Sequence, residues 1–119
     1  MSCSSTWLRI TAAQSIPLRE GRMVDLGDRE IAIFNLGSRF FATDAACPHR
    51  GGPLCDGIVT SAGKGHAVVC PLHGWKIDLE TGRVLKPEVS VRVETYNVRV
   101  VEGIVEVEIP DRAEEEIAA

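Results

Sequence analysis

Short segments in which apolar and polar residues alternate follow one another along most of this 119-residue chain. The clearest is 104–109, where Val105, Val107 and Ile109 alternate with two glutamates. Such alternation is typical of an antiparallel strand with one buried and one exposed face. Other segments are rich in β-branched residues and end at Gly, Asp or Asn, which predicts further strands. These segments are 29–35, 39–43, 57–60, 67–70, 75–79, 83–85, 89–93 and 98–101.

Turn signals between these segments predict how neighbouring strands pair. The Gly-Ser step at 37–38 predicts a hairpin of 29–35 with 39–43, and Glu80-Thr81-Gly82 predicts a second hairpin turn. Many short strands at even spacing, with no long helical pattern, favour an all-β sandwich or barrel of antiparallel sheets. We expect residues 1–6 to be a flexible N-terminus, residues 7–110 to form one domain, and residues 111–119 to be an acidic C-terminal tail.

Composition and charge exclude several classes of function. Hydrophobic residues are 45% and charged residues 25% of the chain, and three of the four net negative charges lie in the last nine residues. A nucleic-acid-binding protein would normally carry a basic face, and the sequence suggests none. No run of about 18 apolar residues could cross a membrane, and the N-terminus lacks the apolar centre of a signal peptide. We therefore expect a cytoplasmic protein that binds neither nucleic acid nor membrane.

Two motifs each combine a cysteine with a histidine: Cys47-Pro48-His49 and Cys70-Pro71-Leu72-His73. The glycines and prolines around them predict two tight loops at strand ends, where a rigid scaffold can direct side chains to one point. Four cysteines in an intracellular chain of this size do not suggest a disulfide framework, so the Cys/His pairs indicate a metal site. The candidate ligands are Cys47, His49, Cys70 and His73.

Three interpretations of these pairs compete. In the first, the residues are separate core cysteines and surface histidines. In the second, they form a structural zinc site of two cysteines and two histidines within an interaction module, although such sites usually separate a Cys pair from a His pair. In the third, they hold a [2Fe–2S] cluster, with two histidines on one iron and two cysteines on the other.

Charge counting shows what the third arrangement would do. Two ferric ions, two sulfides and two thiolates sum to zero, whereas four thiolates would make the oxidised cluster −2. Adding an electron to a neutral cluster is easier, so the reduction potential rises.

Segments 47–54 and 70–75 resemble the two ligand loops of Rieske iron–sulfur domains, and the similarity extends from about Trp7 to Pro110. The resemblance implies that Cys47 and Cys70 bind the inner iron, and that His49 and His73 bind the outer iron of one cluster per chain. It also implies antiparallel sheets with a cluster-binding subdomain inserted between strands.

Four positions differ from the high-potential branch of that family. Its disulfide cysteines correspond to Gly52 and Leu72, and its hydrogen-bonding serine and tyrosine correspond to Trp75 and Ile77. The bridge therefore cannot form, and neither Trp75 nor Ile77 can supply the same bond to the cluster sulfurs. With fewer donors the reduced cluster is stabilised less, so we predict a potential at the lower end of the Rieske range, roughly −150 to 0 mV.

Within the family, the chain resembles the small subunit of assimilatory NAD(P)H-dependent nitrite reductase more than the ferredoxin of ring-hydroxylating dioxygenases. The stretches that carry this preference are 30–35, 57–59, 70–82, 96–100 and 103–107. The resemblance implies one-electron transfer without catalysis on this chain. The partner would be a large siroheme- and flavin-containing subunit that reduces nitrite to ammonium. The dioxygenase ferredoxin is the alternative, and the zinc-binding module a remote one.

Other residues attract attention less strongly. We expect Cys55 to be a small packing residue rather than a ligand, His66 to be exposed in a loop, and Trp75 to pack over the second ligand loop. Three basic residues have two open interpretations, a docking patch for an acidic partner or scattered surface charge. They are Arg50, Lys64 and Lys76.

Overall fold

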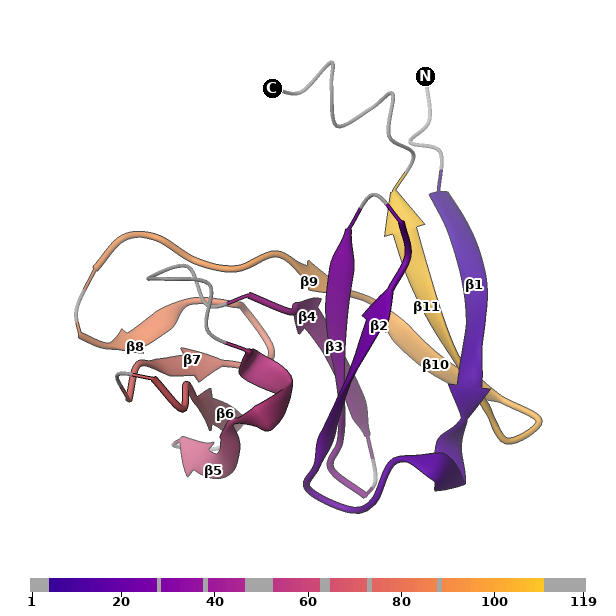
Figure 1. The fold of residues 1–119 in the computed structure, drawn as a ribbon, viewed down its shortest axis with the longest axis horizontal. Helices are drawn as coiled ribbons and strands as arrows, with labels where there is room; N and C mark the ends of the chain where they lie inside the picture. Colours follow the sequence, from indigo (N-terminus) through magenta and orange to yellow (C-terminus); the bar gives the residue numbers. More distant parts are fainter. Residues whose placement is uncertain are drawn as a thin grey trace.

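The computed structural model describes residues 5–27, 29–37, 39–46, 53–62, 65–72, 74–87 and 89–110. Within these residues the regular elements are strands and two short 3₁₀ turns, and every strand pairing is antiparallel. The strands form three sheets that lie in three layers (Figure 1). The all-β fold predicted from the alternation pattern is confirmed.

The first two layers form what we call the base sandwich. One sheet has the order β1-β11-β10 and the other the order β2-β3-β4-β9. The strands of the first sheet are β1 (Ser5–Ala12), β10 (Val98–Val101) and β11 (Ile104–Pro110). Those of the second are β2 (Gly21–Asp25), β3 (Glu30–Asn35), β4 (Phe40–Asp44) and β9 (Thr95–Tyr96). The 3₁₀ turn η1 (Ala13–Ser15) follows β1.

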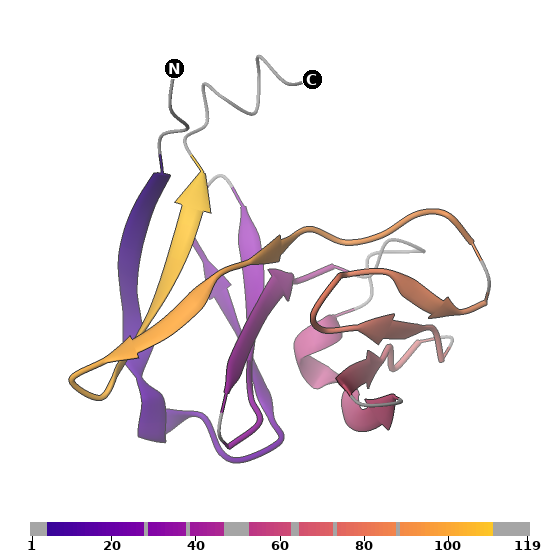
Figure 2. The same ribbon diagram turned by 180° about the vertical axis from the view of Figure 1, so that it is seen from behind.

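The third layer is the inserted subdomain, residues 45–94, which leaves the base sandwich after β4 and returns at β9 (Figure 2). Its sheet has the order β5-β6-β7-β8. The elements are η2 (Leu54–Asp56), β5 (Ile58–Ala62), β6 (Gly65–Val69), β7 (Lys76–Asp78) and β8 (Val84–Lys86). An insertion between strands is what the sequence resemblance implied.

Strand β3 is the structural centre of the molecule because it is buried on both faces. Ile31 and Ile33 belong to the core of the base sandwich, together with Val105 and Val107 of β11. Ala32 and Phe34, which alternate with them, belong to the second core that β3 shares with the inserted subdomain. All four β3 residues are inaccessible to solvent. This explains why the strand is a continuous apolar run rather than an alternating one.

Some strand predictions are confirmed, and others are incomplete or wrong. Strands β3 and β4 pair as the predicted hairpin, and the turn at Gly82 joins β7 to β8. The sequence patterns did not predict β1 and β2. Residues 89–93 are not a strand: they make only an isolated bridge at Arg92, and Val89 and Val91 are exposed. Val93 packs in the core shared with β3, but Val89 and Val91 point away from it, so β propensity alone does not make a strand.

Glu106 corrects the prediction that β11 simply alternates between buried and exposed residues. Its side chain is only 6% exposed although it lies on the outer face of the strand. Arg99 on β10 and Arg9 on β1 bind its carboxylate at 2.7 and 3.6 Å. The Arg99 guanidinium also stacks 4.0 Å from the centre of the Trp7 ring. These long side chains cover Glu106, which a pattern within one strand cannot reveal.

Within the described residues, no helix is long and apolar enough to span a membrane.

Candidate metal centre

Of the four predicted ligands, the structure describes one. Cys47, His49 and His73 lie outside the described residues. Cys70 directly follows β6, is only 3% exposed, and belongs to the core shared by β3 and the inserted subdomain. The structure therefore shows the frame from which the two loops emerge, and the ligand set itself stays a prediction.

The base of the second loop is closed by two backbone hydrogen bonds. The Cys70 N–H donates to the Trp75 carbonyl at 2.7 Å, and the Gly74 N–H donates to the Cys70 carbonyl at 3.0 Å. Gly74 has a φ of +75°, a conformation that glycine adopts without the steric cost of a side chain. These two hydrogen bonds and the glycine at position 74 hold Cys70 at the start of a tight loop.

The base of the first loop is closed in the same manner. Ala46 and Pro53 form an antiparallel bridge, and the Leu54 N–H donates to the Ala45 carbonyl at 2.9 Å. The Ala45 N–H in turn donates to the Glu30 carbonyl at 3.0 Å, which ties this point to β3. The segment 47–52 therefore starts and ends at one place on the inserted subdomain.

Both loop bases rest on the same core. Ala45 and Leu54, which flank the first loop, pack in one buried cluster with Cys70 at the start of the second, and Trp75 packs against that cluster. Two motifs that are separated by 20 residues in the sequence are thus rooted on one hydrophobic support. The expectation that Trp75 packs over the second loop stays a prediction.

The chemistry of this frame fits an iron–sulfur cluster with mixed ligands. Cys70 is a free thiol in an apolar environment, where a cluster of low net charge is favoured over one of high charge. Ile77 is fully buried in the same core, so it fills space and offers no hydrogen bond from its side chain. Leu72 is exposed and lies where the high-potential branch has a disulfide cysteine. No group of three or more metal-ligating side chains occurs among the described residues, which include only Cys70 of the predicted set.

Cys55 is an unsuitable ligand in its present environment. It lies half-buried in η2, and its thiol donates to Asp56 Oδ1 at 3.9 Å. Burial raises the pKa of the Cys55 thiol, and the negative charge of Asp56 raises this pKa further. Since metals bind the thiolate, a thiol held protonated competes poorly. Its role as a packing residue fits its position against the subdomain core.

His66 is not in a loop, and the prediction of an exposed loop residue is wrong. It lies in β6, half-buried, opposite Ser61 of β5, and its carbonyl accepts a hydrogen bond from the Leu79 N–H at 3.0 Å. Its neighbour Gly65, which suggested a loop, is the first residue of β6. Lys76 is half-buried in β7, while Arg50 and Lys64 fall in the undescribed segments, so the docking patch stays a prediction.

A hydrogen-bonded group that the sequence did not reveal lies where the inserted subdomain joins the base sandwich. The Tyr96 hydroxyl donates to Asp44 Oδ1 at 2.6 Å, and Arg29 donates to the Tyr96 oxygen at 3.1 Å. Burial raises the pKa of Tyr96, and the hydrogen bond to the Asp44 carboxylate raises this pKa further. Asp44 and Tyr96 are 52 positions apart, so no local pattern could have paired them.

The family described as "Rieske-like [2Fe-2S] domain" matches residues 6–108. The chain belongs to this family. Its cofactor is therefore a Rieske-type [2Fe–2S] cluster, and the chain is a Rieske electron-transfer protein. Both predictions made from the two Cys/His motifs are thereby confirmed at the level of the family.

Known proteins with similar sequences are ferredoxins of oxygenase systems. The ferredoxin component of naphthalene 1,2-dioxygenase from Pseudomonas aeruginosa is 30% identical over 94 residues, which are 79% of this chain and 86% of the ferredoxin. The anthranilate 1,2-dioxygenase ferredoxin subunit from Burkholderia cepacia is 35% identical over 83 residues, 70% of this chain and 73% of that subunit.

Solved structures also include proteins of the other kind. A protein from Mycobacterium tuberculosis, assigned as a small subunit of NADH-dependent nitrite reductase, superposes with a TM-score of 0.79 and 28% identity. The match covers 88% of this chain and 96% of that one. The similar proteins thus include both ferredoxins of dioxygenase systems and a small subunit of nitrite reductase.

Proposed function

We propose that this chain carries single electrons to or from a protein partner, with Cys47, His49, Cys70 and His73 as the ligands of its cluster. The observation that carries this proposal is the common core beneath the two loop bases, where Ala45, Leu54 and Cys70 meet. When bound, the cluster accepts and gives up one electron without forming or breaking bonds in a substrate. Cys47 and Cys70 would act as thiolates and His49 and His73 as neutral imidazoles.

The surrounding chain would control the site in two ways. The apolar core around Cys70 would keep water from one side of the site. The backbone hydrogen bonds at both loop bases would limit how far the loops move when the oxidation state changes. A rigid site needs little reorganisation when an electron arrives, because its groups are already in position. Neither role requires a catalytic residue on this chain.

We further propose that the partner is the large siroheme- and flavin-containing subunit of an assimilatory NAD(P)H-dependent nitrite reductase, and that this chain is its small subunit. The sequence stretches 70–82, 96–100 and 103–107 support this assignment. The superposition on the Mycobacterium tuberculosis protein supports it as well, since it spans nearly the whole of both chains. In this arrangement electrons pass through the small subunit or beside it while nitrite becomes ammonium.

A second candidate is the ferredoxin of a ring-hydroxylating dioxygenase. It is favoured by the identities of 30% and 35% to two ferredoxins of such systems. In that case the chain would shuttle between a reductase and a terminal oxygenase instead of remaining in one complex.

The ligand set is tested by matched substitutions in anaerobically purified protein. Cys70→Ser, His49→Ala and His73→Ala should each abolish the rhombic paramagnetic signal of the reduced cluster and lower the iron content below two per chain. Cys55→Ser and His66→Ala are the matched controls, since these residues carry the same donor atoms outside the proposed site. A control that lost the signal while its counterpart kept it would overturn the assignment. One zinc and no iron in the wild-type protein would favour the zinc module.

The partner is tested by mixing experiments with the reduced protein. Reoxidation should be rapid with a siroheme- and flavin-containing large subunit plus nitrite, with ammonium as product, and slow with a terminal ring-hydroxylating oxygenase. The cluster-free Cys70→Ser variant should support neither reaction. The reverse preference would make the chain a dioxygenase ferredoxin and would leave the ligand assignment intact.

A further inference from the structure

The chain crosses between the base sandwich and the inserted subdomain twice, and the two crossings are joined to each other. The outward crossing follows Asp44 at the end of β4, and the return crossing precedes Thr95 at the start of β9 (Figure 1). The Asp44 N–H donates to the Glu94 carbonyl at 2.9 Å, and the Glu94 N–H donates to Asp44 Oδ2 at 3.2 Å. Asp44 therefore binds the return crossing with both its backbone and its side chain.

The other carboxylate oxygen of Asp44, Oδ1, belongs to a chain of hydrogen-bonded side chains. Asp44 Oδ1 accepts the hydrogen bond from Tyr96, whose oxygen accepts the one from Arg29. The Arg29 guanidinium also lies 5.7 Å from the centre of the Tyr96 ring, and Tyr96 is only 9% exposed. Three elements meet here: the turn between β2 and β3, the end of β4, and β9. Since hydrogen bonds to charged groups are the stronger ones, this group resists separation of the crossings.

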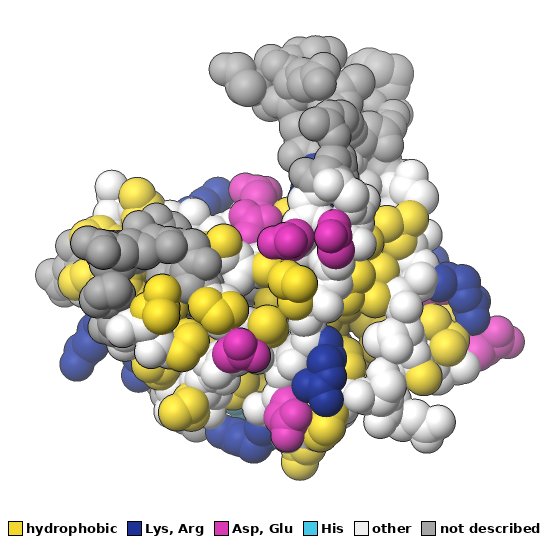
Figure 3. All heavy atoms as spheres, viewed as in Figure 1, with side chains coloured by type: hydrophobic (Ala, Val, Ile, Leu, Met, Phe, Trp, Pro, Cys, Tyr) yellow, Lys and Arg dark blue, Asp and Glu magenta, His cyan; other side chains and the backbone are white. Residues whose placement is uncertain are grey.

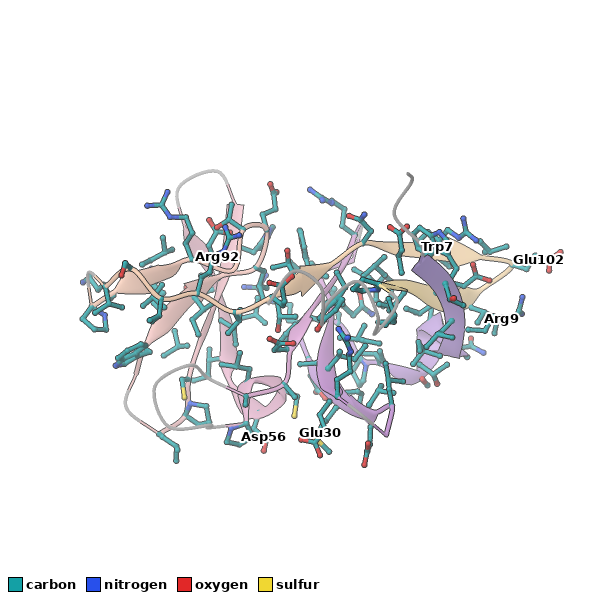
Figure 4. All side chains as sticks on the ribbon, turned by 90° about the horizontal axis from the view of Figure 1, so that it is seen from above. Trp7, Arg9, Glu30, Asp56, Arg92 and Glu102 are labelled. Atoms are coloured by element: carbon teal, nitrogen blue, oxygen red, sulfur yellow. The ribbon has the colours of Figure 1, made fainter. Side chains whose placement is uncertain are left out.

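The outward crossing continues directly into the first ligand loop. Cys47 is three residues beyond Asp44, and the intervening Ala45 is bound to both Glu30 and Leu54 at the base of the first loop. Figure 4 shows Glu30 at the junction between the two bodies of the molecule.

The return crossing is tied to the hairpin that follows the second loop. The Val93 N–H donates to the Gly82 carbonyl at 2.9 Å. The backbones of Arg92 and Arg83 also form an isolated antiparallel β-bridge. The position of Glu94 is thus coupled to the β7–β8 hairpin, which starts directly after the loop of Cys70.

We propose that Asp44, Tyr96 and Arg29 form a clamp that fixes the first ligand loop relative to the second. This inference rests on the proposed function, in which Cys47 belongs to one loop and Cys70 to the other. The three are positioning residues, because they act through the backbone at Ala45 and Glu94. Asp44 is the central member because it bonds to both Tyr96 and the return crossing.

The test uses the full-length, cluster-loaded protein with three variants. Asp44→Ala removes both side-chain bonds, and Tyr96→Phe removes the phenol bond while keeping shape and charge. The matched control is Glu106→Ala, which removes a buried carboxylate bound by two arginines on the outer sheet of the base sandwich, away from the crossings. The variants should therefore lose comparable interactions in different parts of the molecule.

Two measurements distinguish a clamp from general destabilisation. Hydrogen exchange at the Ala45 and Leu54 amides should accelerate about tenfold or more in Asp44→Ala, less in Tyr96→Phe, and little in the control. The rate at which a chelator removes iron, followed by visible absorbance, should rise in the same order. Equal rates for Asp44→Ala and Glu106→Ala in both measurements would overturn the clamp.

Failure of the clamp and failure of the proposed function give different results. Wild-type protein that contains no iron would overturn the proposed function, and the clamp with it. Loaded wild-type protein whose variants match the control would overturn the clamp alone. If Asp44→Ala does not fold, Tyr96→Phe decides, since the loss of one hydroxyl leaves the packing of its ring in place.

Discussion

The base sandwich and the inserted subdomain are built from the same kind of strand but are stabilised differently. The base sandwich pairs strands that are far apart in the sequence, such as β1 with β11 over Ser5–Ala12 and Ile104–Pro110. The inserted subdomain pairs neighbouring strands, two of which have only three residues. Long pairings between distant segments make a rigid support, whereas short local hairpins need closed turns and a neighbouring surface to stay ordered.

The surfaces of the two regions differ as well. On the outer sheet of the base sandwich, Trp7, Arg9 and Arg99 cover Glu106 in a network of ring stacking and ion pairs, and Figure 4 shows Trp7 and Arg9 together on β1. Large apolar side chains are exposed in both regions among the described residues. The base sandwich and its connections expose Leu18, Met23 and Val100, and the inserted subdomain exposes five: Ile58, Leu72, Leu85, Val89 and Val91.

In the view of Figure 3, apolar side chains are exposed over both the inserted subdomain and the base sandwich. Exposed apolar groups are what a region that docks with a partner would present. The long strand pairings of the base sandwich are therefore the clearer difference between the two regions.

Removal of the cluster should give the largest effect and should separate the two regions. Since metal binding is coupled to folding of the segments that supply the ligands, the apoprotein should lose amide protection in β5–β8 by about a hundredfold or more. Strands β1, β3 and β11 should keep most of their protection. Hydrogen exchange followed by mass spectrometry on loaded and chelated protein measures this. Equal loss of protection in both regions would contradict the view that the base sandwich is an independent support.

Phe34→Ala should be the most destabilising single substitution discussed here. Phe34 is fully buried in β3 and packs in the core that the two regions share. Its removal leaves a cavity and should lower the free energy of unfolding by about 3–5 kcal/mol. Met23→Ala on the neighbouring strand is the control, because Met23 is 51% exposed and should change stability by less than about 0.5 kcal/mol. Urea unfolding measures both. A loss below about 1 kcal/mol for Phe34→Ala would show that the shared core does not couple the regions.

Gly82→Ala should destabilise the inserted subdomain by about 2 kcal/mol or more. Gly82 has a φ of +78°, and an added Cβ would lie 2.1 Å from the Val93 carbonyl oxygen, so strain and a backbone clash combine. Gly103→Ala in the base sandwich is a close control, because Gly103 has a φ of +79° but open space around it. This control should cost only about 1–2 kcal/mol of strain. Comparable losses of unfolding free energy would mean that the contact with Val93 yields without cost.

The smallest effect concerns pH and tests the junction of the two regions. Because the folded-state pKa of Tyr96 is raised above its ordinary value of 10.0, the folded form binds the phenol proton more tightly than the unfolded form. The stability from this group is fully present below pH 10 and is lost as pH rises through and above that value.

Wild-type protein should therefore lose up to about 1.4 kcal/mol per pH unit more than Tyr96→Phe between pH 10 and 11. Urea unfolding of both proteins at pH 7, 10 and 11 gives the comparison. Parallel curves would show that the phenol is not held in its neutral form by Asp44.

The tight loop that follows Cys70 could be predicted from the sequence because its information is local, while the full ligand set stays a prediction. Cys70, Gly74 and Trp75 lie within six positions, and their backbone bonds close the loop without help from distant segments. The turn at Gly82 and the hairpin of β3 with β4 are local in the same sense.

The sequence by itself thus determined the all-β class, the inserted loops and the cofactor, since ligand type and turn chemistry are properties of a few adjacent residues. Only the tertiary structure decided that β3 is buried on both faces, that Glu106 is covered by Arg9 and Arg99, and that 89–93 is not a strand. It also decided the bond between Asp44 and Tyr96. Each of these depends on which distant segments meet, and that is set by the packing of whole sheets rather than by the preference of any one segment.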